Sequence, residues 1–514
     1  MFKEANAVML SPRQKKIVEQ PGNQIVRASA GTGKTHTMVS KIEYDIEHQH
    51  THRVVAAITF TIKAANEIKE RLTIDSSSHF IGTNNSFAIE EIIKPFMKDV
   101  FGKEYKLDIS TDYSVKVNTF AEGLAKIKAE QILCSYVNPK NNFIFQLAFN
   151  ILKESKACQL YLQAKYFKIY VDEYQDCDKD MHTLFMYICE SLSIDTFVVG
   201  DEKQSIYFWR GAYPKAFMGI WERQDFSKNF MRDNFRSCQQ IQNYSNLLCY
   251  ETRDLYNPVK DLSSVIMVCA TSTNWVPSVI PYLDFKKKCA VLRYSNANAE
   301  AAAKALTGKN LEFTYIPQTP IRDITTETAW LYNAIAKFFI LPKYSVYDFR
   351  NEIPNEVVGN RKILNYIKDR LNILNECIKQ ENASGFVKQI ILMANDLGYE
   401  TKNNHCDKLY STIYDKQYHP AFNIDDLKQI AITFHSSKGL EFDQVILFVS
   451  DYSLSSEQEI YNHYVAATRA KSKLIMVYIN NDCNARKFAN NINNILAKSN
   501  LKMNNVATVI NCLP

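Results

Sequence analysis

The chain is poor in the residues that mark disordered segments, and its cysteines lack the spacing of a metal site. Glycine and proline occur 14 times each among 514 residues, whereas 46% of the residues are hydrophobic, and this composition argues against extensive disorder. Twelve cysteines lie scattered without a C-x-x-C pair, which predicts reduced thiols instead of a disulfide framework or a zinc site. His405 and Cys406 are adjacent, but no further ligand pair stands at metal-binding spacing.

Targeting and membrane segments are also missing. The first ten residues, MFKEANAVML, lack the apolar run of a signal peptide, and no segment has enough consecutive apolar residues to span a membrane. We therefore expect a cytoplasmic location. The formal net charge of +6 is mild, so it permits a polyanionic partner without requiring one. The length predicts several domains, and we find no internal repeat or low-complexity tract.

The segment IVRASAGTGKT, residues 25–35, has the pattern of a strand that enters a phosphate-binding loop and then a helix. Gly31 and Gly33 allow the backbone to turn its N–H groups toward phosphate oxygens at a helix N-terminus. Lys34 is placed to reach the β- and γ-phosphates, and the Thr35 hydroxyl suits Mg²⁺. The usual first glycine is replaced by alanine. The residues expected around the phosphates are Ala30, Gly31, Thr32, Gly33, Lys34 and Thr35.

An acidic strand supplies the second half of such a site. In FKIYVDEYQD, residues 167–176, apolar residues alternate as in a buried strand, and Asp172 and Glu173 follow at its end, where parallel sheets bind ligands. We expect Asp172 to hold Mg²⁺ together with Thr35, and Glu173 to polarise the attacking water. Alone, the acidic pair would be equally typical of a solvated turn. After a phosphate-binding loop, it indicates an NTPase.

The stretch VGDEKQSIYFWRGA, residues 199–212, places a nucleotide-sensing group beside a nucleic-acid-stacking group. The amide of Gln204 can bond a terminal phosphate and lose that bond when the phosphate leaves. Tyr207 and Trp209 offer faces on which bases can stack, and Arg210 adds a fixed positive fork. For any one of these aromatics, an ordinary hydrophobic strand and turn is the alternative.

With these segments, the chain resembles the UvrD/Rep/PcrA-like helicases of superfamily 1A, from Gln14 to Arg469. The resemblance implies that Gln14 contacts the adenine. It also implies that the segments 57–72 (AITFTIKAANEIKERL) and 81–87 (IGTNNSF) bind single-stranded DNA. The DNA-contacting residues that it implies in these two segments are Thr59, Phe60, Thr61 and Thr83.

Two arginines of the second half complete the implied nucleotide site. In DNFRSCQQI, residues 233–241, the resemblance implies that Phe235 stacks on the adenine and that Arg236 binds the γ-phosphate, and Arg469 would be the second such arginine. Arginines from a second domain can stabilise transition-state charge only when the cleft closes. Taken singly, each of these side chains is as typical of a core or a surface ion pair. Their order and completeness favour the functional interpretation.

The segment ITFHSSKGLEF, residues 432–442, resembles the coupling motif of the second motor domain. The resemblance implies that His435 touches DNA, that Gly439 approaches the phosphates and that Glu441 meets the ribose. The expected cofactors are ATP, or another NTP, and Mg²⁺. The implied catalytic residues are Lys34, Glu173, Gln204, Arg236 and Arg469.

Several positions depart from the family pattern. Ile62 replaces an asparagine, Asn85 a histidine and Phe208 a glycine, and basic residues are absent around residues 459–463. All but one of these departures lie on the DNA side, and none removes a hydrolytic group. The sequence therefore supports ATP hydrolysis better than vigorous unwinding.

The resemblance implies an α/β fold of two RecA-like P-loop motor domains with parallel sheets, each interrupted by a mainly helical insertion. We expect the first motor domain at 1–88 and 165–229 with its insertion at 89–164, and the second at 230–335 and 426–514 with a reduced insertion at 336–425. Helical patterning marks 121–133 and 360–380. Lysines spread through the first insertion fit either a solvated face or a DNA path. They are Lys94, Lys98, Lys103, Lys106, Lys116, Lys126, Lys128 and Lys140.

The small second insertion, the continuation DEYQDCDKDMH (172–182) and the ending HYVAATRA further resemble the helicase-like GajB subunits of Gabija anti-phage systems. This resemblance implies a GajA-type nuclease partner in a hetero-oligomer, and a response to DNA ends or single strands. An autonomous 3′–5′ DNA helicase or translocase of repair or replication restart stays open as the alternative. The intact catalytic residues speak against a scaffold that binds nucleotide without hydrolysing it.

Overall fold

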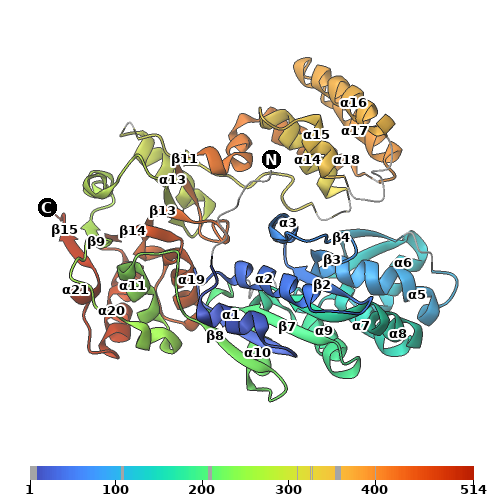
Figure 1. Ribbon diagram of the computed structural model, residues 1–514. Coiled ribbons are helices and arrows are strands. Elements are labelled where there is room, and N and C mark those ends of the chain that lie inside the picture. Colours follow the sequence, from blue (N-terminus) through green and yellow to red (C-terminus); the bar gives the residue numbers. More distant parts are fainter. Residues whose placement is uncertain are drawn as a thin grey trace.

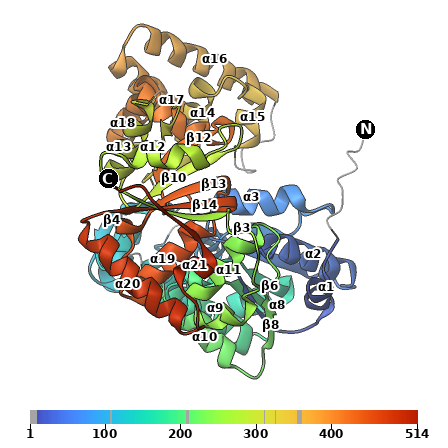
Figure 2. The same cartoon turned by 90° about the vertical axis from the view of Figure 1, so that its left-hand side faces the viewer.

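The computed structural model describes residues 9–105, 109–206, 211–309, 311–324, 326, 328–353, 361–399 and 401–513. In this part of the chain, two parallel sheets lie next to each other, and a group of helices stands apart from both (Figures 1 and 2). The α/β class with parallel sheets is confirmed. Among these residues, no helix combines the length and the apolarity needed to cross a bilayer.

The first sheet has six strands in the spatial order β3-β2-β6-β7-β1-β8, all parallel. In this order β7 lies between β1 and β6. Because the strands are parallel, the chain leaves β1, β6 and β7 at the same carboxyl-terminal edge of the sheet. That edge is where open α/β sheets bind ligands. The strands are β1 (Gln24–Ala28), β2 (Val54–Thr59), β3 (Phe80–Thr83), β6 (Tyr166–Val171), β7 (Asp195–Gly200) and β8 (Ser227–Met231).

Helices cover both faces of the first sheet, because side chains of a strand alternate between its faces and both sets here are apolar. Val26 and Tyr170 belong to the core under α1, α2 and α3, whereas Ile25 and Val171 belong to the core under α9 and α10. These helices are α1 (Pro12–Glu19), α2 (Lys34–Glu47), α3 (Ile62–Arg71), α9 (Lys179–Ser191) and α10 (Pro214–Glu222).

The chain between β3 and β6 forms an accessory region that shares a continuous core with the second face of the first sheet. It contains a two-stranded parallel sheet besides its helices. The helix expected at 121–133 ends at Glu130, because Gln131 has a left-handed φ of 58° and a strand begins at Ile132. The elements are α4 (Asn84–Phe87), the π-helix η1 (Ala88–Ile93), α5 (Lys94–Phe101), β4 (Ser110–Val117), α6 (Phe120–Glu130), β5 (Ile132–Tyr136), α7 (Phe143–Glu154) and α8 (Lys156–Lys165).

The second sheet has seven parallel strands in the order β11-β12-β10-β13-β14-β9-β15. Its strands are β9 (Val265–Ala270), β10 (Cys289–Arg293), β11 (Thr314–Tyr315), β12 (Gln429–Thr433), β13 (Phe442–Phe448), β14 (Ala470–Ile479) and β15 (Thr508–Asn511). One face packs on α11, α19, α20 and α21, and the other packs on α12 and α13. The helices are α11 (Gln239–Leu248), α12 (Trp275–Val279), α13 (Asn296–Thr307), α19 (Glu457–Ala467), α20 (Cys483–Ala497) and α21 (Met503–Val506), with short 3₁₀ turns η5 (Tyr250–Leu255), η6 (Ile280–Tyr282) and η10 (Val449–Asp451).

The remaining helices have a core of their own, which begins at Ile321, ahead of the boundary expected at residue 336. The difference arises because α14 is one apolar helix that starts at Ala329 and runs through the expected boundary. Lys402 of this group pairs with Asp112 at β4, which ties it to the first accessory region. The elements are α14 (Ala329–Ile340), α15 (Val346–Asn351), α16 (Arg361–Lys379), α17 (Ala383–Asp396) and α18 (Asn403–Tyr414), followed by the 3₁₀ turns η8 (Lys416–Phe422) and η9 (Ile424–Asp426).

Candidate nucleotide and DNA site

The candidate site is built from the segments that follow β1, β6 and β7. Lys34 comes after β1, Asp172 directly after β6, and Gln204 closes the 3₁₀ turn η3 (Glu202–Gln204) after β7. Because β7 is the central strand of the three, the turn that carries Gln204 leaves the sheet between the phosphate loop and the acidic pair. The strand order therefore brings together three predicted site residues that are far apart in the chain.

The loop after β1 has the backbone shape that phosphate binding needs. Gly31 and Gly33 adopt left-handed φ values of 75° and 77°, and Gly33 precedes the first residue of α2. A Cβ on Gly31 would lie 2.3 Å from Oδ1 of Asn234, and one on Gly33 would lie 2.9 Å from Nε2 of Gln14. Both the left-handed φ and the close neighbours favour glycine. The N–H groups at the start of α2, which no side chain caps, suit an anion.

Lys34 lies between the two carboxylates that follow β6. Its Nζ forms an ion pair with Oε1 of Glu173 and lies 3.6 Å from Oδ1 of Asp172. Burial lowers the pKa of Lys34, but the charges of Glu173 and Asp172 outweigh burial and hold this pKa above its ordinary value. Lys34 is therefore a protonated ammonium at neutral pH, as an interaction with phosphate oxygens requires.

Glu173 is oriented by several donors and has a left-handed φ of 51°, an uncommon conformation that often occurs at functional sites. Nε2 of Gln175 donates to its Oε2, and Nζ of Lys438 lies 3.8 Å from the same oxygen. Burial raises the pKa of Glu173, but Lys34 and Lys438 lower it below its ordinary value, so the carboxylate is ionised. Asp172 lies deeper and accepts the N–H of Glu173 at 2.8 Å, and burial raises its pKa.

Gln204 connects the first half of the chain to the second. Its Nε2 donates to Oδ2 of Asp201 at 2.8 Å, and its Oε1 accepts from Nη2 of Arg469 at 3.4 Å. Arg469, which follows α19, is buried and also donates to the carbonyls of Val465 and Leu440. Burial and the neighbouring charge of Arg236 lower the pKa of Arg469. Two residues predicted to be catalytic, one from each half of the chain, are thus in contact.

Arg236 and Glu441 lie together at the other side of the cleft. Nε of Arg236 donates to Oε2 of Glu441 at 2.8 Å, and its Nη1 donates to the carbonyl of Thr468 at 3.3 Å. Nζ of Lys471 lies 2.5 Å from the second oxygen of Glu441. Burial raises the pKa of Glu441, but Lys471 and Arg236 bring it below its ordinary value. The carboxylate predicted to meet the ribose is therefore held by two cations.

A small hollow lies beside the residues predicted to bind adenine. The Phe235 side chain is 64% exposed, while its N–H donates to the carbonyl of Gly31 at 2.8 Å. Gln14 is buried, and its amide accepts from the N–H of Ser11 at 2.8 Å and donates to the carbonyl of Thr32 at 3.3 Å. A fixed amide beside an exposed ring suits a planar base. The hollow is lined by Ser11, Arg13, Gln14, Thr32, Met231, Asp233 and Phe235.

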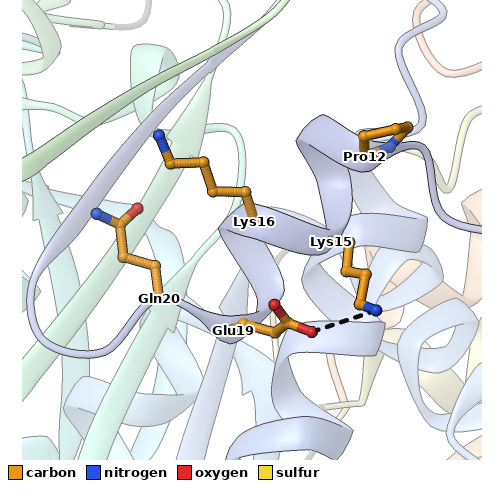
Figure 3. Close-up of a pocket in the computed structure, with 5 residues that line it drawn as sticks. All are labelled: Pro12, Lys15, Lys16, Glu19 and Gln20. Carbon is orange, nitrogen blue, oxygen red and sulfur yellow. Dashed lines mark ion pairs between the residues drawn. The ribbon is translucent and has the colours of Figure 1, made fainter.

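The opposite side of α1 carries an open surface hollow of about 500 Å³ (Figure 3). Lys15 forms an ion pair with Glu19 there, at 3.7 Å between Nζ and Oε1, and both side chains are exposed. Exposed pairs of this kind contribute little to stability. Gln14 lies on the buried face of the same helix, so this hollow is separate from the predicted nucleotide site. It is lined by Pro12, Lys15, Lys16, Glu19 and Gln20.

Several cleft residues were not singled out from the sequence. Lys438 donates to Oδ2 of Asp176 at 2.5 Å and to the carbonyl of Gln204 at 3.1 Å, and so links the second half of the chain to the first. The hydroxyl of Tyr464 accepts the N–H of Ala30 in the phosphate loop at 3.2 Å. Both residues stand inside segments recognised as motifs, SSKGLEF and HYVAATRA. Their place in these motifs could have drawn attention to Lys438 and Tyr464, but the sequence does not show which residues they contact.

The residues predicted to contact DNA at the first sheet lie at the ends of β2 and β3. Thr59 and Thr83 pair in register as the last residues of these strands. Thr61 and Thr83 cap α3 and α4 by accepting backbone N–H groups of the first turn. Thr59 is buried and donates to the carbonyl of Thr61 at 3.0 Å, and Phe60 is half-buried. The strand ends therefore bring these predicted contacts together.

The departures from the family pattern have distinct surroundings. Ile62 is 66% exposed at the start of α3. Nδ2 of Asn85 donates to the hydroxyl of Tyr113 at 3.1 Å, so it is engaged within the accessory region. Glu459 accepts the N–H of Ser455 at 2.8 Å near the start of α19. Phe208 lies outside the described residues, as do Tyr207, Trp209 and Arg210.

His435 follows β12 in the second sheet. Its ring centroid lies 5.7 Å from that of Tyr294, which follows β10 and is 51% exposed. Gly439, further along the same segment, has a left-handed φ of 85° and no atom within 4 Å of the position of a Cβ. Gly439, the predicted phosphate contact, is exposed, and His435, the predicted DNA contact, is half-buried.

Comparison with known proteins gives this geometry its context. The model of the UvrD/REP helicase N-terminal domain matches residues 10–133 and 131–225, and that of the UvrD-like helicase C-terminal domain matches residues 352–481. Gabija protein GajB of Bacillus cereus (strain VD045) is 38% identical over 499 residues, which cover 95% of this chain and 98% of that protein. The chain belongs to the UvrD/Rep helicase family.

More distant members of the family are longer. ATP-dependent DNA helicase Rep of Escherichia coli (strain K12) is 25% identical over 448 residues, covering 76% of this chain but 62% of Rep. Rep of Buchnera aphidicola (subsp. Acyrthosiphon pisum, strain APS) is 27% identical, covering 61% of this chain and 57% of that protein. The family assignment makes this UvrD-like chain an ATP hydrolase of the helicase type.

The residues of the cleft fit the nucleotide that the family uses. Left-handed glycines precede the exposed N–H groups of α2, a protonated lysine lies beside two carboxylates, and an exposed phenylalanine stands next to a fixed amide. The first two features suit phosphates, and the last suits a purine ring. Thr35 in the first turn of α2 and Asp172 after β6 are oxygen donors of the kind that Mg²⁺ prefers.

Proposed function

We propose that this UvrD-like chain is the ATPase subunit of a Gabija-type anti-phage system in the cytoplasm, that it responds to DNA ends or single strands, and that it acts with a GajA-type nuclease subunit. The observation that carries this proposal is the similarity to GajB, which extends over 95% of this chain and 98% of that protein. A match of this extent supports the same arrangement of domains in the two proteins. The two motor domains and two insertions expected from the sequence are part of the proposal.

We assign the hydrolytic roles to residues that face the cleft. Glu173, ionised and held by Gln175, would accept a proton from the attacking water. Lys34 would bind the β- and γ-phosphates, and Gln204 would contact the terminal phosphate. Arg236 and Arg469, both from the second half of the chain, would stabilise the charge that develops in the transition state. The remaining nucleotide contacts proposed are those of Gln14, Ala30, Gly31, Thr32, Gly33, Thr35, Phe235, Gly439 and Glu441.

Thr35 and Asp172 would hold Mg²⁺, which, when bound, neutralises phosphate charge. In the structure, Lys34 bridges the two carboxylates that follow β6. For Lys34 to reach phosphate oxygens, its ammonium must leave Glu173. That carboxylate would then be free to accept a proton from water. Nucleotide binding by Lys34 would therefore also release Glu173 to act as the base.

Several proposed DNA contacts lie near the proposed catalytic residues. Thr59, Phe60, Thr61 and Thr83 lie at the ends of β2, which pairs with β6, and of β3, which is the next strand beyond β2. His435 lies three residues before Lys438, which bonds the carbonyl of Gln204. Tyr207, Trp209 and Arg210 stand three to six residues after Gln204 in the sequence. This closeness supports a role in which DNA binding changes the rate of ATP hydrolysis.

An autonomous 3′–5′ helicase or translocase is the second candidate. The similarity to Rep over 76% of this chain favours it. Two observations favour the subunit role instead: the chain is shorter than Rep, and Asn85 is engaged by Tyr113 within the accessory region. The two candidates differ in how much strand separation they require.

The deciding experiment measures ATP turnover with and without single-stranded DNA, strand displacement on a tailed duplex, and co-purification with a co-expressed GajA-type nuclease. We expect DNA-stimulated turnover, weak displacement and a stable complex with the nuclease. The matched control is Glu173→Gln, which should bind nucleotide and nuclease but not turn over ATP. Strong displacement without a nuclease complex would establish the autonomous helicase, and turnover that ignores DNA would reject both candidates.

A further inference from the structure

Tyr464 is a buried tyrosine of α19 whose hydroxyl reaches across the cleft to the first half of the chain. It is 2% exposed, and its hydroxyl accepts the N–H of Ala30 at 3.2 Å and donates to Oδ2 of Asp201 at 3.5 Å. Its ring lies 5.6 Å from Nζ of Lys203. Ala30 belongs to the phosphate loop after β1, and Asp201 begins the turn after β7. One hydroxyl therefore connects two segments of the first half to a helix of the second.

Asp201 links this hydroxyl to the proposed phosphate sensor. The carboxylate of Asp201 is fully buried, and its Oδ2 also accepts from Nε2 of Gln204 at 2.8 Å. The opposite end of the Gln204 amide accepts from Arg469, which lies just beyond the end of α19. The same helix thus contacts Gln204 directly through Arg469 and indirectly through Tyr464 and Asp201. Both contacts exist only while α19 lies against the first half of the chain.

The protonation state supports this arrangement. Burial, with the charge of Asp201, raises the pKa of Tyr464 well above its ordinary value, so the phenol keeps its proton and can donate to the carboxylate. Lys203 forms an ion pair with Asp201 at 2.6 Å, so the buried carboxylate also has a cation beside it. A buried N–H of the phosphate loop and a buried carboxylate oxygen thus both bond to one hydroxyl from the other half.

We propose that Tyr464 is a positioning residue for ATP hydrolysis: when the cleft closes, its hydroxyl fixes the phosphate loop at Ala30 and the amide of Gln204 through Asp201. The proposal rests on the role proposed for Gln204. An open cleft would withdraw the Tyr464 hydroxyl and Arg469 together, and Gln204 would keep only its bond to Asp201. The effect belongs to the closed state, in which the phosphate is cleaved, and not to the first encounter with nucleotide.

The test is Tyr464→Phe, which keeps the ring and removes the hydroxyl. The matched control is Tyr461→Phe, because the Tyr461 hydroxyl lies one turn away on the same helix and donates to Glu457 within that helix, at 2.7 Å. We expect Tyr464→Phe to lower kcat about tenfold per nucleotide-binding site, which corresponds to about 1.4 kcal/mol. The Kd for a fluorescent ATP analogue should change less than about twofold, and the control should change neither quantity.

A purely structural role would give a different pattern. It would lower the thermal midpoint and the fraction of the protein that binds nucleotide, and it would leave kcat per nucleotide-binding site intact. A wild-type kcat in Tyr464→Phe, or an equal loss in Tyr461→Phe, would overturn the proposal.

A double-mutant cycle with Gln204→Ala separates this inference from the role on which it rests. If Tyr464 acts through Gln204, removing its hydroxyl from the Gln204→Ala protein should lower kcat by less than about twofold, because neighbouring residues of one network are not additive. The full tenfold loss on that background would overturn the inference while leaving the role of Gln204 intact. A Gln204→Ala protein with wild-type kcat would instead remove the proposed role of Gln204, and the inference with it.

Discussion

Replacing Gly31 with alanine tests the tightest point of the candidate nucleotide site. Gly31 has a left-handed φ of 75°, which costs an alanine about 1–2 kcal/mol. The new Cβ would lie 2.3 Å from Oδ1 of Asn234, and this oxygen accepts the N–H groups of Arg236 and Ser237. Displacing it would remove two hydrogen bonds of about 1 kcal/mol each. Together, the backbone strain and the two lost hydrogen bonds would cost about 3–4 kcal/mol if the loop and its neighbours stayed in place.

The protein can avoid this strain only by moving the segment of Asn234 off the loop or by reshaping the loop. Either response separates groups that the nucleotide needs together, so we expect ATP to bind roughly a hundredfold more weakly, as about 3 kcal/mol requires. Binding of a fluorescent ATP analogue and denaturant unfolding measure both consequences.

Gly219→Ala is the matched control, because Gly219 lies in α10 with nothing within 4 Å of the added Cβ. That substitution should stabilise the protein by about 0.5–1 kcal/mol without affecting nucleotide binding. If Gly31→Ala bound the analogue with wild-type affinity and unfolded at the same denaturant concentration, the close approach of Asn234 to the loop would be wrong.

Three further variants address the base, the exposed ring and a buried histidine. Glu173→Gln should bind ATP but lower kcat by about 10²–10⁴, because the amide cannot accept the proton of water. Phe235→Ala should weaken ATP binding about tenfold, within the usual worth of a base stacked on an aromatic ring, and leave stability unchanged, since its ring is exposed. Burial lowers the pKa of His463 to about 3. Its neutral form therefore stabilises the folded state above about pH 6.5, and this contribution is lost as the pH falls toward 3, at up to about 1.4 kcal/mol per pH unit. In His463→Gln, unfolding free energy should depend less on pH across that window.

Each of these variants has a result that would contradict it. Steady-state turnover of Glu173→Gln near that of the wild type would assign the base elsewhere. Unchanged ATP affinity in Phe235→Ala would show that the ring does not meet the adenine. Parallel pH profiles for the wild type and His463→Gln, measured by denaturant unfolding, would mean that His463 does not remain neutral in the folded protein.

The sequence could indicate the strand ends that carry the candidate site because their chemistry is local. A glycine with left-handed φ, a lysine at the start of a helix and a carboxylate at the end of an apolar strand are each specified by a few consecutive residues. The helix expected at 121–133 is present as α6 but ends at Glu130, because the chain turns at Gln131 and enters β5, whose pairing with β4 depends on a partner strand. The core that contains α14 begins at Ile321, and no local pattern marks that start because its members are distant in the chain.

By itself, the sequence determined the parallel α/β class, the family and the groups that we propose to surround a nucleotide, because motifs of consecutive residues encode each of them. The tertiary structure alone decided that β7 lies between β1 and β6, that Arg469 meets Gln204, and that Tyr464 and Lys438 close on the first half of the chain. Strand order and contacts between the two halves arise from packing between segments hundreds of residues apart. No local pattern of residues carries that information.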